Sequence, residues 1–379
     1  MIGLYIHVPF CNGKCPYCDF YSVAGDDSVK EAYTQVLEKQ LAFWAEKLAR
    51  EGTSPKADTL YFGGGTPNLL GASRLARLIR KAQECFGLEK AEITLEVNPA
   101  SQLDDFFREV FQAGANRVSI GLQSTHNTEL KALGRRHTAE QALATIDAAR
   151  WAGFSNLSLD LMLATPGQTT GSALASAALC AELGVPHVSA YLLKVEPGTP
   201  FWERRAALTL PNEDETARRY LTVGASLENA GLKQYEISNF AWPGYESRHN
   251  LKYWHCEEYL GLGPGAHSYL NGKRFYYPRD LSAFLQSPTP VADGEGGTLE
   301  ETILLGLRLR EGITRYGLEK AFGEEGRAAF QAMEKKGRLY QSAGLLETDG
   351  NRMALTPQGF LVSNSLIAEL LPDEGCKFR

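Results

Sequence analysis

The chain has few of the features that mark secreted, membrane-spanning or nucleic-acid-binding proteins. Its 379 residues begin without a basic segment followed by a long apolar stretch, and its cysteines number seven, an odd count. We therefore expect no signal peptide and a reducing compartment, the cytoplasm. The longest uncharged run, Leu161 to Ala181, includes Thr165, Pro166 and Gly167 and is too polar to span a bilayer. The net charge of −6 lacks the basic surplus of a dedicated nucleic-acid binder.

What the chain does have is enough apolar sequence for a sizeable core, 44% of its residues. Short β-rich runs alternate with amphipathic stretches through the first half, which predicts parallel strands joined by crossover helices. The expected strands are Leu4–Val8, Thr59–Phe62, Ile93–Val97, Arg117–Ile120, Leu157–Met162 and His187–Leu193. The expected helices cover Val29–Leu48, Arg74–Cys85, Leu103–Gln112, Ala139–Trp151 and Ser172–Leu183, and a glycine closely follows most of them.

Six such units predict an α/β fold, a partial (β/α)6 version of the eight-stranded TIM-like barrel, with an open doubly wound sheet as the alternative. Barrel enzymes carry their chemistry in loops at the carboxyl ends of the strands. The unusual residues lie at these ends: a cysteine cluster after the first strand, a Gly-Gly-Gly-Thr-Pro run after the second, and Glu96 and Asn98 on the third. Gln123 follows the fourth strand, and Asp160 lies late in the fifth. We therefore expect one shared site at the mouth of the barrel.

The pattern changes after about residue 210, which predicts three parts. Residues 1–210 form the barrel, and residues 211–286 form an extension rich in aromatics and glycine that packs on it. The breakers in Ser287–Thr298 predict a linker. Residues 299–379 then predict a small α+β module, in which helices are followed by a hairpin with an Asp-Gly turn and a helix over Pro357–Leu370. This arrangement is winged-helix-like, but fold alone does not imply nucleic-acid binding.

Three cysteines lie within eight residues, Cys11, Cys15 and Cys18. Thiolates at this spacing on one loop can converge on a metal centre. A structural zinc site would need a fourth ligand, and no cysteine or histidine follows at zinc-finger spacing. A cubane iron–sulfur cluster held by three thiolates leaves one iron open for another ligand. The spacing therefore favours a [4Fe-4S] cluster over zinc.

The Cys-x3-Cys-x2-Cys spacing after a first strand resembles the signature of radical S-adenosylmethionine (SAM) enzymes, in which the open iron binds SAM. Five segments narrow the resemblance to the oxygen-independent coproporphyrinogen III oxidase-like family. They are Tyr5-Ile-His-Val-Pro-Phe-Cys, Tyr61-Phe-Gly-Gly-Gly-Thr-Pro, Glu96-Val-Asn-Pro, Gly121-Leu-Gln-Ser and Gly261-Leu-Gly-Pro-Gly-Ala-His-Ser. The similarity runs from about Ile2 to Leu370.

This resemblance implies a set of cofactor contacts and assigns no catalytic side chain. The cluster would be held by Cys11, Cys15 and Cys18. The SAM-binding positions would be Tyr5, Tyr17, Gly64, Gly65, Thr66, Glu96, Gln123, Arg135 and Asp160. The alternative for Tyr5 is a core aromatic, and the alternative for Glu96 and Asp160 is a solvated strand end. Arg135 would pair with the SAM carboxylate through its guanidinium, with the neighbouring Arg136 and His137 as competitors. The glycines permit close backbone approach, although a tight strand-to-helix turn needs them equally.

Two departures separate the chain from the oxidase proper. The oxidase has a further cysteine where this chain has Phe20, and it has an extended segment before its first strand, where this chain has only ten residues ahead of Cys11. The chain instead resembles the HemW branch, the heme chaperones, which carry His-Asn-x-x-Tyr-Trp. That motif is His249-Asn-Leu-Lys-Tyr-Trp here.

An imidazole beside aromatic rings suits a heme iron, so His249 is a candidate heme ligand, with His255 and Cys256 as competitors. The alternative is that His249 is a hydrogen-bonded packing residue. The resemblance implies a chaperone that binds [4Fe-4S], SAM and heme, and that passes heme to acceptor proteins such as respiratory cytochromes. The competing function is radical-SAM oxidative decarboxylation of porphyrinogen propionates.

Overall fold

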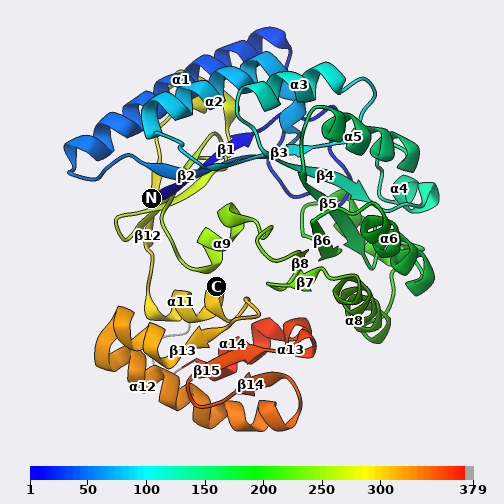
Figure 1. Ribbon diagram of the computed structural model, residues 1–379, viewed down its shortest axis with the longest axis vertical. Helices are drawn as coiled ribbons and strands as arrows, with labels where there is room; N and C mark the ends of the chain where they lie inside the picture. Colours follow the sequence, from blue (N-terminus) through cyan, green and yellow to red (C-terminus); the bar gives the residue numbers. More distant parts are fainter. Residues whose placement is uncertain (372–379) are drawn as a thin grey trace.

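The computed structural model describes residues 1–371; Cys376 and the other positions from 372 to 379 lie outside the described residues. A twelve-stranded sheet dominates the molecule, in the order β12-β11-β10-β9-β1-β2-β3-β4-β5-β6-β8-β7 (Figure 1). Its centre is six parallel strands in sequence order: β1 Ile2–Val8, β2 Ala57–Gly64, β3 Glu92–Val97, β4 Arg117–Gln123, β5 Asn156–Leu163 and β6 His187–Leu192. The two ends of the sheet are not paired, so the barrel is partial, as expected.

Helices connect these strands on the outside of the curved sheet (Figure 1). They are α1 Asp27–Arg50, α2 Ala72–Phe86, α3 Asp104–Gln112, α4 Asn127–Ala132, α5 Ala139–Trp151 and α6 Thr170–Glu182. The sequence-based strands and helices lie inside these elements or differ at the ends by a few residues. Gly87 ends α2 in the left-handed conformation, with φ of 56°, as a C-terminal cap requires.

The segment expected to be a linker is partly a strand, and that expectation is wrong over β12 (Val291–Glu295). β12 pairs with β11 (Lys273–Tyr276), which pairs with β10 (His267–Leu270), and β10 pairs with β9 (Tyr259–Leu262) beside β1. Every residue of β12 is exposed, so this edge strand lacks the alternation of buried and exposed side chains that would have revealed it. Helix α10 (Leu281–Gln286) precedes it.

At the other end of the sheet, α7 (Pro200–Glu203) and α8 (Glu213–Asn229) lead to β7 (Lys233–Gln234) and β8 (Asn239–Ala241). Asn212 caps α8 in a capping box with Glu215. Helix α9 (Arg248–Trp254) then lies between the two ends of the curved sheet, close to β2 (Figure 1). Among residues 1–371, no helix combines the length and apolarity needed to cross a bilayer.

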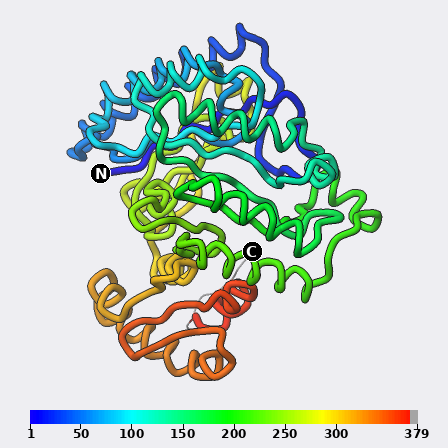
Figure 2. The backbone as a smooth tube through the Cα atoms, turned by 45° about the vertical axis from the view of Figure 1, so that its right-hand side comes forward, coloured from blue at the N-terminus to red at the C-terminus, as the bar shows by residue number. Residues whose placement is uncertain are grey.

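The C-terminal part has its own small sheet, in the order β13-β15-β14, and its own hydrophobic cluster centred on Phe330 and Met333. It lies below the barrel in both backbone views (Figures 1 and 2). Its elements are α11 Leu299–Gly306, β13 Ile313–Thr314, α12 Arg315–Ser342, β14 Leu346–Thr348, β15 Arg352–Leu355, α13 Pro357–Leu361 and α14 Ser363–Leu370.

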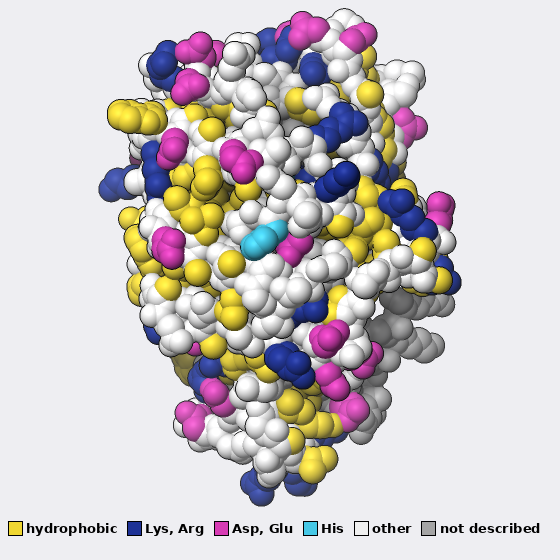
Figure 3. Space-filling view, turned by 90° about the vertical axis from the view of Figure 1, so that its right-hand side faces the viewer, with side chains coloured by type: hydrophobic (Ala, Val, Ile, Leu, Met, Phe, Trp, Pro, Cys, Tyr) yellow, Lys and Arg dark blue, Asp and Glu magenta, His cyan; other side chains and the backbone are white. Residues whose placement is uncertain are grey.

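Two details of this part differ from the sequence-based expectation or refine it. The final helix is two helices, because the backbone leaves helical geometry at Val362. Helix α12 is broken at Gly323, which has φ of 61°. The expected hairpin is present as β14 and β15, with Gly350 in its turn at φ of 85°. On the face shown in Figure 3, acidic and basic side chains are interspersed.

Candidate functional site

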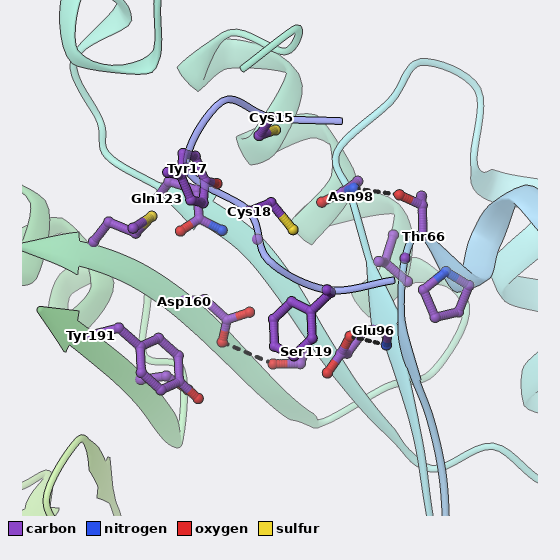
Figure 4. A pocket seen from close by; sticks show the side chains of 18 of the residues that line it. Cys15, Tyr17, Cys18, Thr66, Glu96, Asn98, Ser119, Gln123, Asp160 and Tyr191 are labelled. Atoms are coloured by element: carbon purple, nitrogen blue, oxygen red, sulfur yellow. Dashed lines mark hydrogen bonds between the residues drawn. The ribbon is translucent and has the colours of Figure 1, made fainter. Parts of the chain in front are cut away.

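The inner side of the barrel carries polar side chains at every second position of its parallel strands. Residues two apart on a strand face the same side, and paired residues of neighbouring parallel strands share that face. Together they line a cavity of about 630 Å³ that extends from the cysteine loop down to α9 (Figure 4). The strand residues that line it include Tyr61, Glu96, Arg117, Ser119, Asp160, His187, Ser189 and Tyr191.

The cysteine loop crosses the mouth of this cavity. Cys15 and Cys18 line it, and the Sγ of Cys11 lies 3.2 Å from the Oγ1 of Thr66. All three thiols are half-buried and free of disulfides. The part of the chain that the structure describes has no group of three or more histidine, cysteine or acidic side chains gathered tightly enough for a single ion. Cys15 and Cys18 thus line the mouth directly, and Cys11 lies beside it at Thr66.

The Gly-Gly-Gly-Thr turn lies against the first strand. A Cβ on Gly65 would lie 2.8 Å from the backbone oxygens of Val8 and Phe10, and one on Gly64 would meet the ring of His7. Gly64 also has φ of 106°, which favours glycine. Both glycines are thus required by close packing of the chain on itself. They also line the cavity together with Thr66, so their backbone groups are presented to a ligand.

Two carboxylates face the middle of the cavity. Glu96 accepts hydrogen bonds from the hydroxyl of Tyr61 at 2.8 Å and from the backbone N–H of Gly64 at 3.2 Å. Asp160 accepts one from Ser119 Oγ at 3.0 Å (Figure 4). Burial raises the pKa of Glu96 to about 7, and burial also raises the pKa of Asp160. These groups suit hydroxyls and cations, which a carboxylate recognises by accepting hydrogen bonds.

Arg135 joins the cysteine loop to the strand ends. Its Nη2 donates to Asn98 Oδ1 at 2.7 Å and to the carbonyl of Gly121 at 3.2 Å, while its Nη1 lies 3.9 Å from the Sγ of Cys15. The two expected competitors are placed elsewhere. Arg136 lies against Gly13, and His137 is buried with its Nε2 bonded to the carbonyl of Leu122. Of Arg135, Arg136 and His137, only Arg135 lines the cavity in the described part of the chain.

Gln123 ends β4 with a positive φ of 67°, next to a register irregularity between β4 and β5. Such a conformation costs about 1–3 kcal/mol in a non-glycine residue and is concentrated at functional sites. The strain turns the chain at the strand end, and the side chain of Gln123 lines the cavity.

The two tyrosines predicted to contact the cofactor occupy different places. Tyr17 lines the cavity and packs against Phe201, with ring centroids 6.2 Å apart. Tyr5 lies behind the cavity wall. Its hydroxyl is 3.1 Å from His7 Nδ1, and its ring stacks on Tyr61 and His249. Tyr5 therefore supports the wall through Tyr61 instead of facing the space.

His249 lies at the lower end of the barrel, where β1 and β2 begin, and the residue is 1% exposed. Its Nδ1 is 2.8 Å from Thr59 Oγ1, and its Nε2 is 2.7 Å from the hydroxyl of Tyr253. Its ring stacks on Tyr61 at 5.1 Å, and burial lowers its pKa to about 3. Both ring nitrogens are engaged, which matches the alternative of a hydrogen-bonded packing residue. Of its competitors, His255 pairs with Glu311 at 2.7 Å, and Cys256 is half-buried near Glu301.

Sequence reasoning missed the lower wall of the cavity, which is formed by Arg117, Ser119, His187, Ser189 and Asn250. A signal for the first four was present. Parallel barrel strands are normally apolar on both faces, whereas a polar residue recurs at every second position of β4, β5 and β6. Residue spacing could not reveal Asn250, because α9 is far from the parallel strands in the sequence and meets them only in the folded protein.

The residues at the mouth fit an iron–sulfur cluster with SAM. They combine three free thiols, a backbone cradle at Gly64–Thr66, a guanidinium at Arg135 and two buried carboxylates. Gly121 leaves room for the guanidinium, since a Cβ there would lie 3.2 Å from both Asn98 Oδ1 and Arg135 Nη2. Phe20, 63% exposed, lies at the mouth where the oxidase has its extra cysteine.

Comparison with known families agrees with this site. Residues 5–180 match the Radical SAM superfamily, which implies a [4Fe-4S] cluster and SAM, and residues 298–362 match the HemN C-terminal domain. In fold, the chain resembles the coproporphyrinogen III oxidase HemN from Escherichia coli, a radical SAM enzyme. The TM-score is 0.82 at 21% identity, covering 97% of this chain and 89% of that one.

Three curated relatives are similar over nearly their whole length, and each is named heme chaperone HemW. The protein from Mycobacterium tuberculosis is 38% identical over 97% of this chain and 94% of its own. The Lactococcus lactis protein is 35% identical over 98% and 97%, and the Bacillus subtilis protein is 32% identical over 98% and 99%. With these relatives and the radical SAM site, the chain belongs to the HemW family of radical SAM proteins.

Proposed function

We propose that this chain is a heme-binding chaperone built on a radical SAM scaffold, which delivers heme to acceptor proteins such as respiratory cytochromes in the cytoplasm. The observation that carries the proposal is the near-full-length similarity to proteins named heme chaperone HemW. The exposed Phe20 at the cavity mouth, in place of the oxidase cysteine, supports it.

In this proposal the cysteine loop holds the cluster through Cys11, Cys15 and Cys18. The cluster and SAM together supply radical chemistry when bound, and the protein supplies binding and orientation. Arg135 carries positive charge next to Cys15 and is tied to Asn98, so it is oriented toward a carboxylate bound at the mouth.

The strand ends would hold the rest of SAM. Gly64, Gly65 and Thr66 offer their backbone groups to its amino-acid end, and Glu96 and Asp160 accept from its ribose hydroxyls or lie near its sulfonium. Gln123 and Tyr17 complete the wall from β4 and from the cysteine loop. Tyr5 acts from behind, because it packs on Tyr61 and Tyr61 in turn orients Glu96.

His249 is the proposed heme ligand of the His-Asn-x-x-Tyr-Trp motif, and its geometry sets a condition on that role. Its Nε2 can bind iron only after leaving the hydroxyl of Tyr253, and the ring must reach a space open to heme. In the described conformation the ring instead supports the lower end of the barrel.

The test is a titration of hemin into anaerobically purified protein, followed by mixing with an apo-cytochrome of the b type. We expect a shifted Soret band in the first step and its transfer to the apo-cytochrome in the second. His249→Ala is compared with His255→Ala, which tests the competing ligand, and with His267→Ala on the exposed surface as the control. An unchanged Soret band in His249→Ala refutes ligation by His249 and leaves the chaperone function standing.

Two outcomes would overturn the function itself. The first is a wild-type protein that binds no hemin. The second comes from an anaerobic assay of the reconstituted protein with coproporphyrinogen III: formation of protoporphyrinogen would assign the oxidase activity instead.

A further inference from the structure

Arg117 is a buried guanidinium at the lower end of the cavity whose Nε has no hydrogen-bond partner in the described chain. It begins β4, is 2% exposed and lines the cavity. Its Nε is fully enclosed and lacks a hydrogen bond, and within residues 1–371 its side chain makes neither a hydrogen bond nor an ion pair. An arginine side chain stays ionised, and burying a charged group without hydrogen bonds is strongly unfavourable. A feature this costly indicates that a ligand supplies the missing partner.

Glu96 and Asp160 interact with Arg117 through charge alone. Its positive charge opposes the rise in pKa that burial causes at both carboxyls, while their hydrogen bonds are made to other groups. Glu96 accepts from Tyr61 and Gly64, and Asp160 accepts from Ser119, one step farther up the same inner face. The register partners of Arg117, Thr94 and Asn156, cannot neutralise it. Each is uncharged, and each has a buried side-chain oxygen without a hydrogen bond in the described chain.

A second donor faces the same space from α9. Asn250 lines the cavity, and its side-chain amide makes no hydrogen bond to any residue that the structure describes. Two contacts fix the helix that carries it. Glu92 accepts from the backbone N–H groups of Arg248 and His249, each at 3.1 Å, and Lys252 pairs with Asp58 at 2.9 Å. The position of Asn250 is therefore rigid.

We propose that Arg117 and Asn250 form a subsite for the carboxylate of a bound ligand. The guanidinium presents a fork of N–H donors that matches a carboxylate in two parallel hydrogen bonds, and the amide adds another donor. A phosphate fits less well, because Glu96 and Asp160 line the same cavity and repel a multiply charged anion.

The carboxylate has two possible sources. One is a propionate of a tetrapyrrole, and this source rests on the proposed function. The other is the methionyl carboxylate of SAM, which would then enter below Glu96 instead of pairing with Arg135. Either carboxylate would pair with the guanidinium of Arg117 in the same way. Binding measurements with carboxylate-free analogues separate the two sources.

The experiment compares ligand pairs on the full-length protein, purified anaerobically with its cluster. Hemin is paired with its dimethyl ester, and SAM is paired with decarboxylated SAM. We expect the wild-type protein to bind the acid of one pair at least tenfold more tightly than its carboxylate-free form. Arg117→Met removes this preference, Arg117→Lys retains part of it, and Asn250→Leu weakens it severalfold.

Arg108→Met on the exposed surface of α3 makes the same chemical change as a control and keeps the preference. Thermal unfolding of Arg117→Met beside the wild-type protein shows whether this variant folds. If it fails to fold, Arg117→Lys and Asn250→Leu carry the test.

The subsite is refuted if neither pair shows a preference in the wild-type protein, or if the preference survives in the Arg117 and Asn250 variants. Failure to bind hemin in any form refutes the proposed function separately, and the SAM pair then decides the subsite alone.

Discussion

We expect Glu96 to make the affinity for SAM depend on pH. Its carboxyl lies inside the cavity, and burial raises its pKa from 4.5 to about 7. A ligand with a sulfonium cation and ribose hydroxyls favours the ionised form. If only that form binds, the affinity falls about tenfold for each pH unit below 7 and levels off above it.

The stability of the ligand-free protein has the opposite dependence. The folded state holds the extra proton, because the pKa of Glu96 is higher there than in the unfolded chain. The resulting stabilisation is complete below pH 4.5 and is lost as the pH rises through 7. The difference of pKa corresponds to at most about 3 kcal/mol. Glu236 adds a similar dependence of stability from outside the cavity, because its pKa is also raised by burial to about 7.

SAM affinity therefore isolates Glu96 better than stability does. Calorimetric titration of the reconstituted protein at half-unit steps from pH 5.5 to 8.5 should show the tenfold slope below pH 7. Glu96→Gln should show only a shallow residual slope from Asp160, whereas Glu236→Gln should behave as wild type. A flat affinity in the wild-type protein, or a full slope in Glu96→Gln, would refute the reasoning.

Three further predictions concern the supporting structure and the cluster. His249→Ala should lower the free energy of unfolding by about 2–4 kcal/mol in urea denaturation, because Thr59 and Tyr253 lose buried hydrogen bonds; a loss below 0.5 kcal/mol would contradict this. Gly65→Ala should lower the melting temperature, since its Cβ would lie 2.8 Å from two backbone oxygens, at a cost of about 1–3 kcal/mol; an unchanged melting temperature would count against it. Serine in place of Cys11, Cys15 or Cys18 should bleach the broad visible absorbance of anaerobically purified protein, whereas Cys180→Ser, in the core, should keep it. Colour retained when all three are replaced would exclude the cluster.

Much of the barrel was predictable because its information is local. Each parallel strand is a short run in which aliphatic residues recur at alternate positions, and each helix has its own apolar stripe and end signals, as at Gly87 and Asn212. The strand β12 was not predictable, because all of its side chains are exposed and nothing but its pairing with β11 makes it a strand. The division of the last helix at Val362 likewise has no signal in the spacing of apolar residues.

The upper half of the site was also accessible from sequence, since cluster ligands and glycine-rich turns are contiguous motifs. The spacing of the cysteines indicated the cluster, and the motifs of the parallel strands indicated Glu96, Gln123 and Asp160. The sequence alone left Tyr5 open between a cofactor contact and a core aromatic. Tyr5 and Tyr17 are both aromatic residues near the cysteine loop, and only packing decides that Tyr17 faces the cavity while Tyr5 supports its wall.

The amino-acid sequence by itself therefore determined the fold class, the family and the residues at the mouth of the barrel. The tertiary structure alone decided the lower end of the cavity, where α9 brings Asn250 into the space that Arg117 lines, and where His249 bonds to Thr59 and Tyr253. The physical reason is that hydrogen bonding and burial of these groups depend on contacts between segments far apart in the chain. Spacing along the sequence carries no record of such contacts.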